Sequence, residues 1–459
     1  MELIINPPEK EWRRLCGRNI PADDDIEQSV SRIIETVRCE GDAALRSMSA
    51  RFDHTEIANI ALSESEIDDA CAKVAPEVAE AIRNAAANIE TFHRAQRPAE
   101  VDIFTAPGVR CVQRPVPIEK VGLYIPGGRA PLFSTVLMLG VPARIAGCRE
   151  VVLCTPQSGT YGIAPEILYA ARVCGITKIY RIGGAQAIAA MAYGTESVPA
   201  VDKIFGPGNR YVTKAKQLLS RITAIDMPAG PSEVMVLADS TASPEFVAAD
   251  MLSQAEHGPD SQAILVCDSE NFARQAIEEI SRLSGMLLRK DSVEGSLSHS
   301  RVIVFSSRCE MIDFANTYAA EHLILSLSDP WEAASQITAA GSVFIGNFSP
   351  ESAGDYASGT NHTLPTSGWA RAFSGVNLDS FFRKITYQEL TPDGLASLAP
   401  TIITMARAEG LDAHALAVSV RTEKNHSLSP PYVIQKYGKT SRTCPQEYSC
   451  PTALFHRKR

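Results

Sequence analysis

Two side chains that bind metals, an amide and an imidazole, lie three positions apart in the stretch "SQAEHGPDSQ" (residues 253–262). On an α-helix, Gln254 and His257 would be separated by about 60° around the axis, so that both could face one point. The following Gly258-Pro259 ends the helix and places the pair where a site can open. The stretch equally fits a surface glutamine beside a capping histidine.

A carboxylate and a second imidazole could complete such a site. Asp355 lies in "SAGDYASGTNH", where glycines and serines permit tight turns that would bring the carboxylate inward. His414 lies in "RAEGLDAHALA". Together with Gln254 and His257 they would supply nitrogen and oxygen ligands, which suit zinc and also manganese or cobalt.

Two adjacent titratable residues, Glu321 and His322, end a segment that the apolar pattern predicts to be a helix over residues 310–323. Adjacent residues diverge by about 100° on a helix and rarely share one ligand. Aimed at different atoms, they suit a general base and a carboxylate that activates water. A solvent-facing pair at the end of a helix fits the sequence equally well.

Length and charge narrow the class of protein. A chain of 459 residues is expected to form two or more domains. Its net charge of -9 argues against nucleic acid as the main partner, and no long uncharged apolar run predicts a membrane span. The amino-terminal stretch resembles no signal or transit peptide, so we expect a cytoplasmic protein. The scattered cysteines are expected to be reduced, and Cys444, Cys450 and His456 lack zinc-site spacing.

Short apolar runs, of which the first four stop at Gly or Pro, alternate with helical patterns, and this alternation predicts parallel sheets covered by helices. Expected strands lie at residues 120–128, 150–156, 178–184, 203–209, 233–239, 262–268, 301–306 and 341–346. Ligands in such sheets bind beyond the carboxyl ends of the strands. Residues 22–105 are predicted to form amphipathic helices, and the stretch from Thr422 onward, which loses periodicity, a disordered or loosely docked tail.

Several long motifs resemble histidinol dehydrogenases, in order and at similar spacing, over roughly residues 5–422. They are "VGLYIPGGRAPLFSTVLM", "RIGGAQAIAAMAYGTESVPAVDKIFGPGNRYVTKAK", "DMPAGPSEVMVLAD", "DMLSQAEHGPDSQA", "AEHL", "GDYASGTNHTLPT" and "RAEGLDAHALAVSVR". The resemblance implies an enzyme that completes histidine biosynthesis. It would oxidise L-histidinol to L-histidinaldehyde and then to L-histidine, using two NAD⁺ and one Zn²⁺ per subunit.

The resemblance also assigns roles to individual residues. It implies that Gln254, His257, Asp355 and His414 bind zinc, that His322 takes the hydroxyl proton, and that Glu321 activates the water that hydrates the aldehyde. Substrate contacts would come from Ser232, His362 and Glu409 as well as from His322 and the four zinc ligands. The implied NAD⁺ contacts are Tyr124, Gln186 and Asn209. The sequence "GPGNRY" starts like a dinucleotide fingerprint but has Tyr211 in place of the third glycine, which agrees with an incomplete Rossmann type.

The implied architecture has two incomplete Rossmann-like domains with small helical dimerisation segments at both ends. Its parts would be an arm of residues 1–20, a metal-bearing domain of 21–123 with 233–375, a cofactor-bearing domain of 124–232, a segment of 376–422 that reaches the partner subunit, and a tail of 423–459. The homodimer would share its active sites, with Glu409 and His414 acting across subunits. Two departures from the family are Gly258, where an acidic residue is usual, and the unmatched tail.

Two other functions fit parts of the pattern. A relative with the same fold could oxidise another polar alcohol, such as a sulfonated diol, although Glu409 and His414 favour a substrate with amine and imidazole groups. A metal-dependent hydrolase or a binding protein could use the same ligand cluster without any dinucleotide. Binding of NAD⁺ separates this last class from the other two.

Overall fold

The computed structural model describes residues 1–18, 24–127, 131–157, 162–228 and 230–423. The expected tail therefore lies, except for residue 423, outside the described residues. The chain divides into two compact units, and the first comprises Met1–Ala99 and Pro115–Ile385. The second comprises Glu100–Arg114 and the described part of Thr386–Arg459. Within the described residues, no helix has the length and apolar character needed to cross a membrane.

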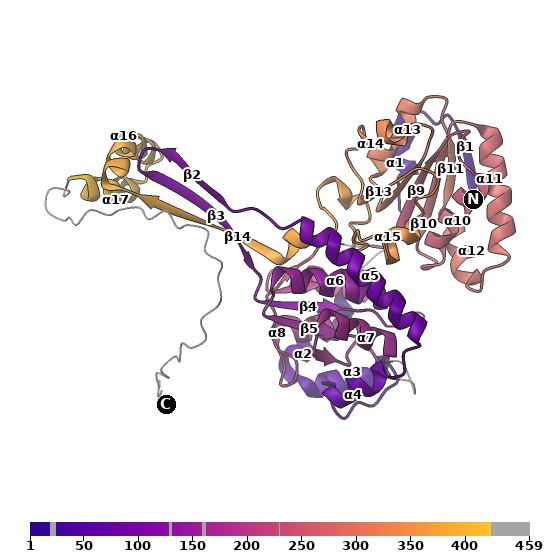
Figure 1. Cartoon of the computed structure of the whole chain (residues 1–459), viewed down its shortest axis with the longest axis horizontal. Helices are drawn as coiled ribbons and strands as arrows, with labels where there is room; N and C mark the ends of the chain where they lie inside the picture. Colours follow the sequence, from indigo (N-terminus) through magenta and orange to yellow (C-terminus); the bar gives the residue numbers. More distant parts are fainter. Residues whose placement is uncertain (19–23, 128–130, 158–161, 229, 424–459) are drawn as a thin grey trace. The chain divides into compact units, whose positions relative to one another are not determined.

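One sheet of the first unit has six parallel strands in the order β1-β11-β10-β9-β12-β13 (Figure 1). The strands are β1 (Glu2–Ile5), β9 (Glu233–Ala238), β10 (Gln262–Cys267), β11 (Arg301–Val304), β12 (His322–Ser326) and β13 (Ser342–Ile345). The central strands β9 and β10 are buried along their whole length, because helices cover both faces.

The two faces of this sheet have separate apolar cores. One core contains residues of α10 (Pro244–Ala255), α11 (Glu270–Ser284) and α12 (Lys290–His299). The other contains residues of α1 (Glu9–Leu15), α13 (Arg308–Tyr318) and α14 (Pro330–Ala334). The expected amino-terminal arm is part of this sheet, since β1 pairs with β11 and Trp12 packs edge-on against Phe305 and Phe314.

The second sheet of this unit has five parallel strands in the order β6-β5-β4-β7-β8. They are β4 (Lys120–Tyr124), β5 (Glu150–Cys154), β6 (Lys178–Tyr180), β7 (Lys203–Phe205) and β8 (Ala224–Ile225). The connecting helices are α6 (Phe133–Ala146), α7 (Pro165–Cys174), α8 (Gly184–Tyr193) and α9 (Arg210–Leu219). The predicted pair of parallel sheets, each wound with helices on both faces, is confirmed.

The amphipathic helices of the amino-terminal third pack on this five-stranded sheet (Figure 1). α2 (Asp24–Glu40) and α3 (Asp42–Phe52) share an apolar core with α8, whereas α4 (Glu64–Cys71) and α5 (Pro76–Ala95) share one with α6 and α7. This packing differs from the expected domain, which combined residues 21–123 with residues 233–375. An amphipathic pattern shows that a helix covers an apolar surface but does not indicate which sheet provides it.

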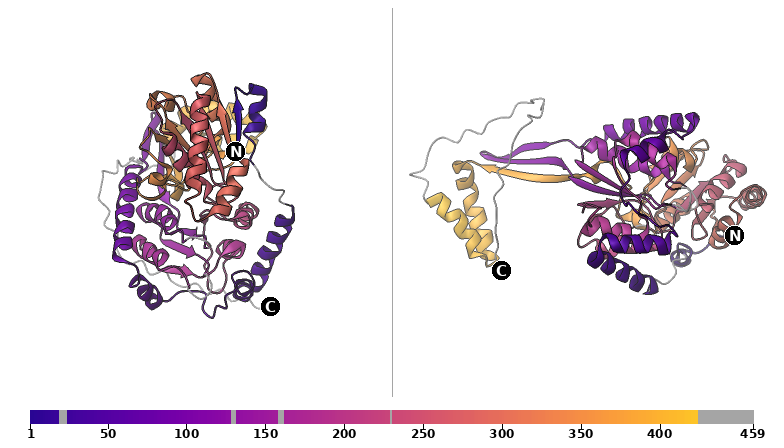
Figure 2. Two further views of the ribbon diagram at one scale, coloured as in Figure 1. Left: turned by 90° about the vertical axis from the view of Figure 1, so that its right-hand side faces the viewer. Right: turned by 90° about the horizontal axis from the view of Figure 1, so that it is seen from below.

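The second unit contains strand β2 (Val101–Ala106), parts of β3 (Val109–Pro117) and β14 (Phe382–Leu390), and two helices. The three strands form one sheet in the order β14-β3-β2. Helices α16 (Pro392–Ala408) and α17 (Asp412–Glu423) lie side by side (Figure 2). Gly410, with a positive φ of 73°, permits the sharp turn between them.

Candidate active site

The Glu321-His322 pair lies at the start of a strand and not on a helix. α13 ends at Tyr318, and Ala319 adopts the left-handed conformation with φ 55°, which stops the helix before the pair. His322 is the first residue of β12. The prediction of a helix over residues 310–323 is therefore wrong at its end, because the apolar side chains after residue 319 belong to a buried strand that follows without a Gly or Pro signal.

Glu321 is anchored by the neighbouring strand. Its Oε2 accepts a hydrogen bond of 2.8 Å from the backbone N–H of Glu233, the first residue of β9. Glu233 is itself paired with Arg18, whose Nε and Nη2 each lie 2.8 Å from a carboxylate oxygen. Burial raises the pKa of Glu321 to about 8.

Three carboxylates surround the ring of His322. Its Nδ1 lies 3.7 Å from Glu321 Oε2 and 3.8 Å from Glu351 Oε1, and its Nε2 lies 3.6 Å from Asp355 Oδ1. Burial lowers the pKa of His322, but the negative charges of Glu351, Glu321 and Asp355 more than offset this and raise it to about 10. Burial raises the pKa of Glu351 to about 8, whereas the contact with His322 outweighs burial at Asp355 and lowers its pKa.

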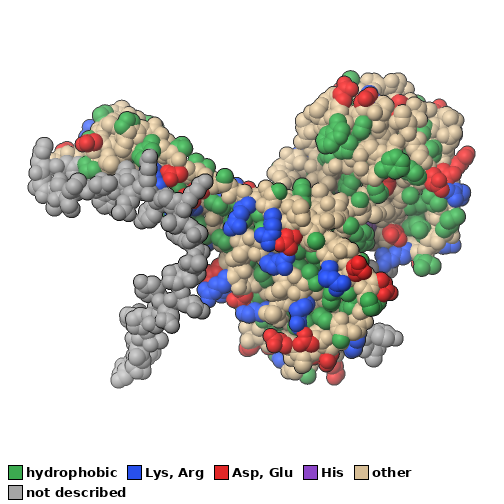
Figure 3. Space-filling model, in the orientation of Figure 1, with side chains coloured by type: hydrophobic (Ala, Val, Ile, Leu, Met, Phe, Trp, Pro, Cys, Tyr) green, Lys and Arg blue, Asp and Glu red, His purple; other side chains and the backbone are tan. Residues whose placement is uncertain are grey.

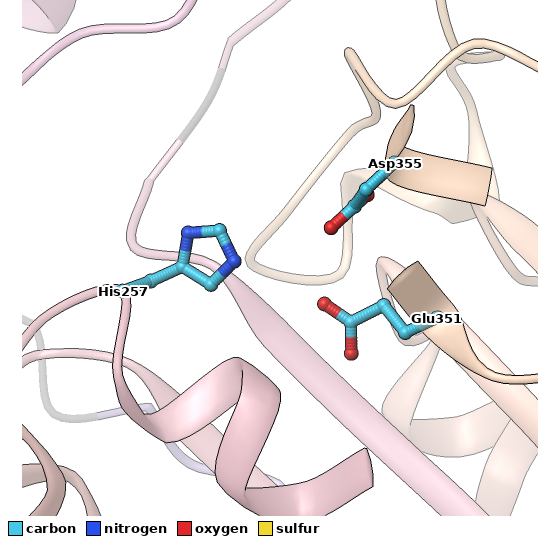
Figure 4. A group of neighbouring side chains, drawn as sticks. All are labelled: His257, Glu351 and Asp355. Atoms are coloured by element: carbon cyan, nitrogen blue, oxygen red, sulfur yellow. The ribbon is translucent and has the colours of Figure 1, made fainter. Parts of the chain in front are cut away.

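A short helix carries Asp355, in place of the expected Gly- and Ser-rich turns. This helix, α15 (Glu351–Tyr356), begins after Pro350, and its positions i and i+4 are Glu351 and Asp355. Both side chains therefore lie on one face of the helix. They point toward the space that the ring of His257 also faces (Figure 4). One ligand atom from each of the three residues lies within 4.8 Å of the others.

Gln254 and His257 lie at the end of α10, and the ring of His257 faces this space. Gln254 lies in the last turn, and His257 follows two residues after the end, with its N–H donating to the Gln254 carbonyl at 3.2 Å. The Gln254 side chain is fully buried, and neither its amide oxygen nor its amide nitrogen has a hydrogen-bond partner among the described residues. His257 is exposed, although the protein atoms around it lower the pKa of its imidazole.

These observations test whether the residues fit a metal. Buried polar atoms without partners are rare because each costs free energy, so the Gln254 amide is expected to have a partner that the protein itself does not supply. Neutral imidazole, carboxylate and amide oxygen are ligands of the kind zinc accepts. The residues that the structure brings together here therefore fit a metal ion.

His362 supports Asp355 from a neighbouring loop. Its Nδ1 lies 2.9 Å from the Asp355 carbonyl, and its Nε2 lies 3.1 Å from Thr135 Oγ1 on α6. The adjacent Asn361 donates a 2.6 Å hydrogen bond to the carbonyl of Met138 on α6. That carbonyl lies four residues before Pro142, which has no N–H to donate to it. The interior proline of α6 thus provides an anchor for the loop.

A cavity of about 660 Å³ opens beside this cluster and is lined by Ser232 and His257 together with Asn209 from the other sheet. Ser232, Gln254, His257 and His322 all lie at the amino ends of strands of the six-stranded sheet or at the end of α10 beside them. These candidate residues therefore lie at the opposite edge of this sheet from the carboxyl ends where ligands were expected. α10 runs antiparallel to the strands and places its own carboxyl end, with Gln254 and His257, at that edge.

In the five-stranded sheet the candidate cofactor residues lie beyond the carboxyl ends of the strands. Tyr124, Gln186 and Asn209 line a cavity of about 600 Å³. Tyr124 ends β4, and Asn209 follows β7, which lies beside β4 where the strand order reverses. Gln186 is buried, and its Nε2 has no partner among the described residues. Asn209 caps α9 by accepting from the backbone N–H groups of Tyr211 and Val212.

The remaining two predicted site residues belong to the second unit. Glu409 follows the last residue of α16, and His414 lies in the first turn of α17. Both side chains are exposed. The structure therefore brings together Gln254, His257, Glu321, His322, Asp355 and His362 in the first unit, and it describes Glu409 and His414 in another.

One residue of the cluster, Glu351, is absent from the sequence-based set. Its spacing of four residues from Asp355 would have indicated a shared helix face, but the glycines and serines around Asp355 favoured a loop. Burial of its carboxylate, with 1% of the side chain exposed, could not be predicted from the sequence.

Comparison with known proteins identifies the family. The histidinol dehydrogenase family matches residues 17–422. The chain is 55% identical to a histidinol dehydrogenase of Bacteroides fragilis over 425 residues, covering 92% of this chain and 99% of the relative. It is 54% identical to one of Yersinia pestis over 426 residues, covering 92% and 95%. A crystal structure of histidinol dehydrogenase from Elizabethkingia anophelis superposes with a TM-score of 0.90 at 51% identity, covering 92% of this chain and 98% of that one. The chain therefore belongs to the histidinol dehydrogenase family of oxidoreductases.

Proposed function

We propose that this protein oxidises L-histidinol to L-histidine through L-histidinaldehyde, in the last step of histidine biosynthesis, with Zn²⁺ and two molecules of NAD⁺. The relatives' shared name supports the substrate. Two observations carry the metal-dependent part. His257, Glu351 and Asp355 converge within 4.8 Å, and the buried amide of Gln254, three residues before His257, has no partner among the described residues. We place this reaction in the cytoplasm, where the free cysteines of the described chain are expected to stay reduced.

The proposed zinc ligands from one chain are Gln254, His257 and Asp355, and His414 of a second copy supplies the fourth. Gln254 and His257 are held by the end of α10, and Asp355 by α15 and His362. When bound, zinc supplies a template for the amino and imidazole nitrogens of the substrate, and NAD⁺ supplies the hydride acceptor.

Two residues divide the proton chemistry. His322, in its neutral form, accepts the hydroxyl proton of the alcohol as the first hydride leaves, and a cation bound to Asp355 would offset one of the negative charges that raise the pKa of this ring. Glu321 then accepts a proton from the water that adds to the aldehyde, and the resulting hydrate loses the second hydride. The backbone hydrogen bond from Glu233 holds one oxygen of Glu321, which leaves the other oxygen for water. Burial of both side chains excludes bulk water that would compete for these protons.

The cavity beside Tyr124, Gln186 and Asn209 is the proposed NAD⁺ site. Asn209 and Tyr211 line both this cavity and the one beside His257, so one extended ligand can reach from the first to the second. Asn209 uses its amide oxygen to cap α9, and its amide nitrogen is left to donate to the cofactor.

Ser232, His362 and Glu409 are the further proposed substrate contacts. Ser232 lines the cavity that also contains His257. For His362, a contact with substrate would replace its 3.1 Å interaction with Thr135, because both ring nitrogens already have partners. Glu409 is exposed and, like His414, would act on the site of a second copy.

Exposed apolar side chains of the second unit support the proposed homodimer. On the face drawn in Figure 3, apolar side chains are exposed over this unit. Large apolar residues that are at least one-third exposed there are Val101, Ile103, Phe104, Tyr387, Met405, Leu411, Leu416 and Val420. Exposed apolar residues gathered in one small unit are typical of an interface. A second copy is the proposed partner because His414 and Glu409 lie among these residues.

Mixing two inactive variants tests the shared site. Homodimers of His257→Asn and of His414→Ala should each be inactive, whereas subunit exchange should restore about a quarter of wild-type activity, because half of the dimers would contain one intact site. No recovery in a mixture whose subunits are shown to exchange would contradict a site built from two chains. Parallel assays with L-histidinol and a sulfonated diol then establish which alcohol is oxidised.

A further inference from the structure

Glu351 is a buried carboxylate that the proposed reaction does not yet use. Its side chain is 1% exposed, and neither oxygen accepts a hydrogen bond from any described residue. A carboxylate in that position is costly unless it gains a donor. Its titratable neighbours are His322, Asp355, Glu321, Asp250 of α10 and His257. Of the two imidazoles, His322 is buried beside Glu351, whereas His257 is exposed and is a proposed metal ligand, so His322 is the N–H donor available to Glu351.

The helix α15 places acids on both sides of the imidazole ring. Glu351 Oε1 lies 3.8 Å from Nδ1 of His322, and Asp355 Oδ1 lies 3.6 Å from Nε2. Figure 4 shows both carboxylates pointing into the space shared with His257. Because the two acids are four residues apart on one helix, the helix fixes the spacing of their carboxylates beside the ring.

The two acids are not equivalent in the proposed site. Asp355 is a proposed metal ligand. If its carboxylate binds the metal, it no longer holds Nε2 of His322, which is then free to face the substrate hydroxyl. The other acid near Nδ1 is Glu321, 3.7 Å away, which already accepts the Glu233 N–H. His322 Nδ1 has no hydrogen-bond partner among the described residues. A shift of less than 1 Å would bring it and the unpartnered Glu351 oxygen to about 3 Å.

We propose that Glu351 is a positioning residue for His322. Its carboxylate accepts the Nδ1–H, which fixes the tautomer that leaves the Nε2 lone pair toward the reacting hydroxyl. The hydroxyl proton then passes to Nε2, the Nδ1–H stays in place, and Glu351 remains ionised beside the imidazolium. This inference rests on the proposed function, since it assigns a partner to the proposed base.

Kinetics and metal analysis of Glu351→Gln test the proposal. We expect kcat for L-histidinol to fall by about 10²- to 10⁴-fold, as is usual for loss of general-base function. The KM for L-histidinol should change little, and zinc should remain at the wild-type stoichiometry. Glu351→Asp should recover part of kcat. Glu278→Gln, the same change at an exposed position of α11, is the matched control.

Two outcomes would overturn the proposal. Loss of zinc from Glu351→Gln would make Glu351 a metal ligand, which its place within 4.8 Å of His257 and Asp355 also permits. An unchanged kcat with zinc retained would show that His322 needs no such partner.

A second measurement is independent of turnover. A downfield Nδ1–H proton resonance should be present in the wild-type protein, absent in His322→Asn and lost or shifted upfield in Glu351→Gln. Its persistence unchanged in Glu351→Gln would overturn the contact. If wild-type protein produces no NADH from L-histidinol, the proposed function fails, whereas this resonance still decides whether Glu351 holds His322.

Discussion

The Arg18–Glu233 pair offers a strong test of how the fold supports the site. Replacing Arg18 by Met removes a two-pronged ion pair with 2.8 Å contacts to both Glu233 oxygens. It also removes a 2.7 Å hydrogen bond to the Tyr318 carbonyl and the packing of the guanidinium 3.8 Å over the Tyr318 ring. Glu233 would remain buried, with 1% of its side chain exposed and its cation gone.

The expected cost follows from that burial. Removing one partner of a buried ion pair destabilises a protein by about 3–5 kcal/mol, because the remaining charge is left without compensation. The Arg18 side chain is 13% exposed, which favours the lower half of this range. Adding Glu233→Gln should recover most of the loss, since the orphaned charge is then removed. The backbone N–H of Glu233 holds Glu321, so activity should fall as well.

Urea unfolding, monitored by tryptophan fluorescence, measures the loss in the free energy of unfolding. Trp12 is the buried tryptophan and packs in the core of the six-stranded sheet, so its signal reports on the part of the fold that contains the pair. Arg282→Met is the matched control, because its exposed pairs with Glu279 and Glu245 should contribute at most about 1 kcal/mol. If Arg18→Met lowers the free energy of unfolding by less than about 1 kcal/mol, the expected cost of leaving Glu233 without its partner is wrong.

Three further predictions concern the site and the interface. Glu321→Gln should slow oxidation of L-histidinaldehyde by about 10²-fold or more while affecting the first hydride transfer less, and equal losses in both steps would contradict its role with water. His257→Asn should abolish stoichiometric zinc binding in metal analysis, and zinc retained at one per subunit would exclude it as a ligand. Leu416→Glu places a charge on an exposed apolar side chain of α17 and should shift sedimentation toward monomer, whereas an unchanged dimer would exclude this face from the interface.

The strands were predictable because short apolar runs alternate with helical patterns. The runs at residues 233–239 and 262–268, for example, correspond to β9 and β10, whose burial on both faces demands unbroken apolar sequence. The end of α13 was not predictable, since Ala319 takes a left-handed conformation that alanine rarely adopts. Nothing in the local sequence marks that position.

The site was predictable only in part. Gln254 and His257 are close in sequence, but only Gln254 lies in the last turn of α10, whereas His257 lies two residues beyond the helix in which the spacing placed both. The contact of Asp355 with His322 and that of His362 with Thr135, 227 positions away, depend on tertiary packing. Glu351 was not predicted for the same reason. Its proposed role depends on its burial beside His322 in the folded chain.

The most direct test of the account is the yield of NADH per L-histidinol consumed, measured on protein stripped of metal and then reloaded with zinc. A zinc-dependent four-electron oxidation predicts two NADH per substrate, formed only after zinc is restored. One NADH per substrate, or a yield that does not depend on the metal, would contradict a zinc-dependent four-electron oxidation.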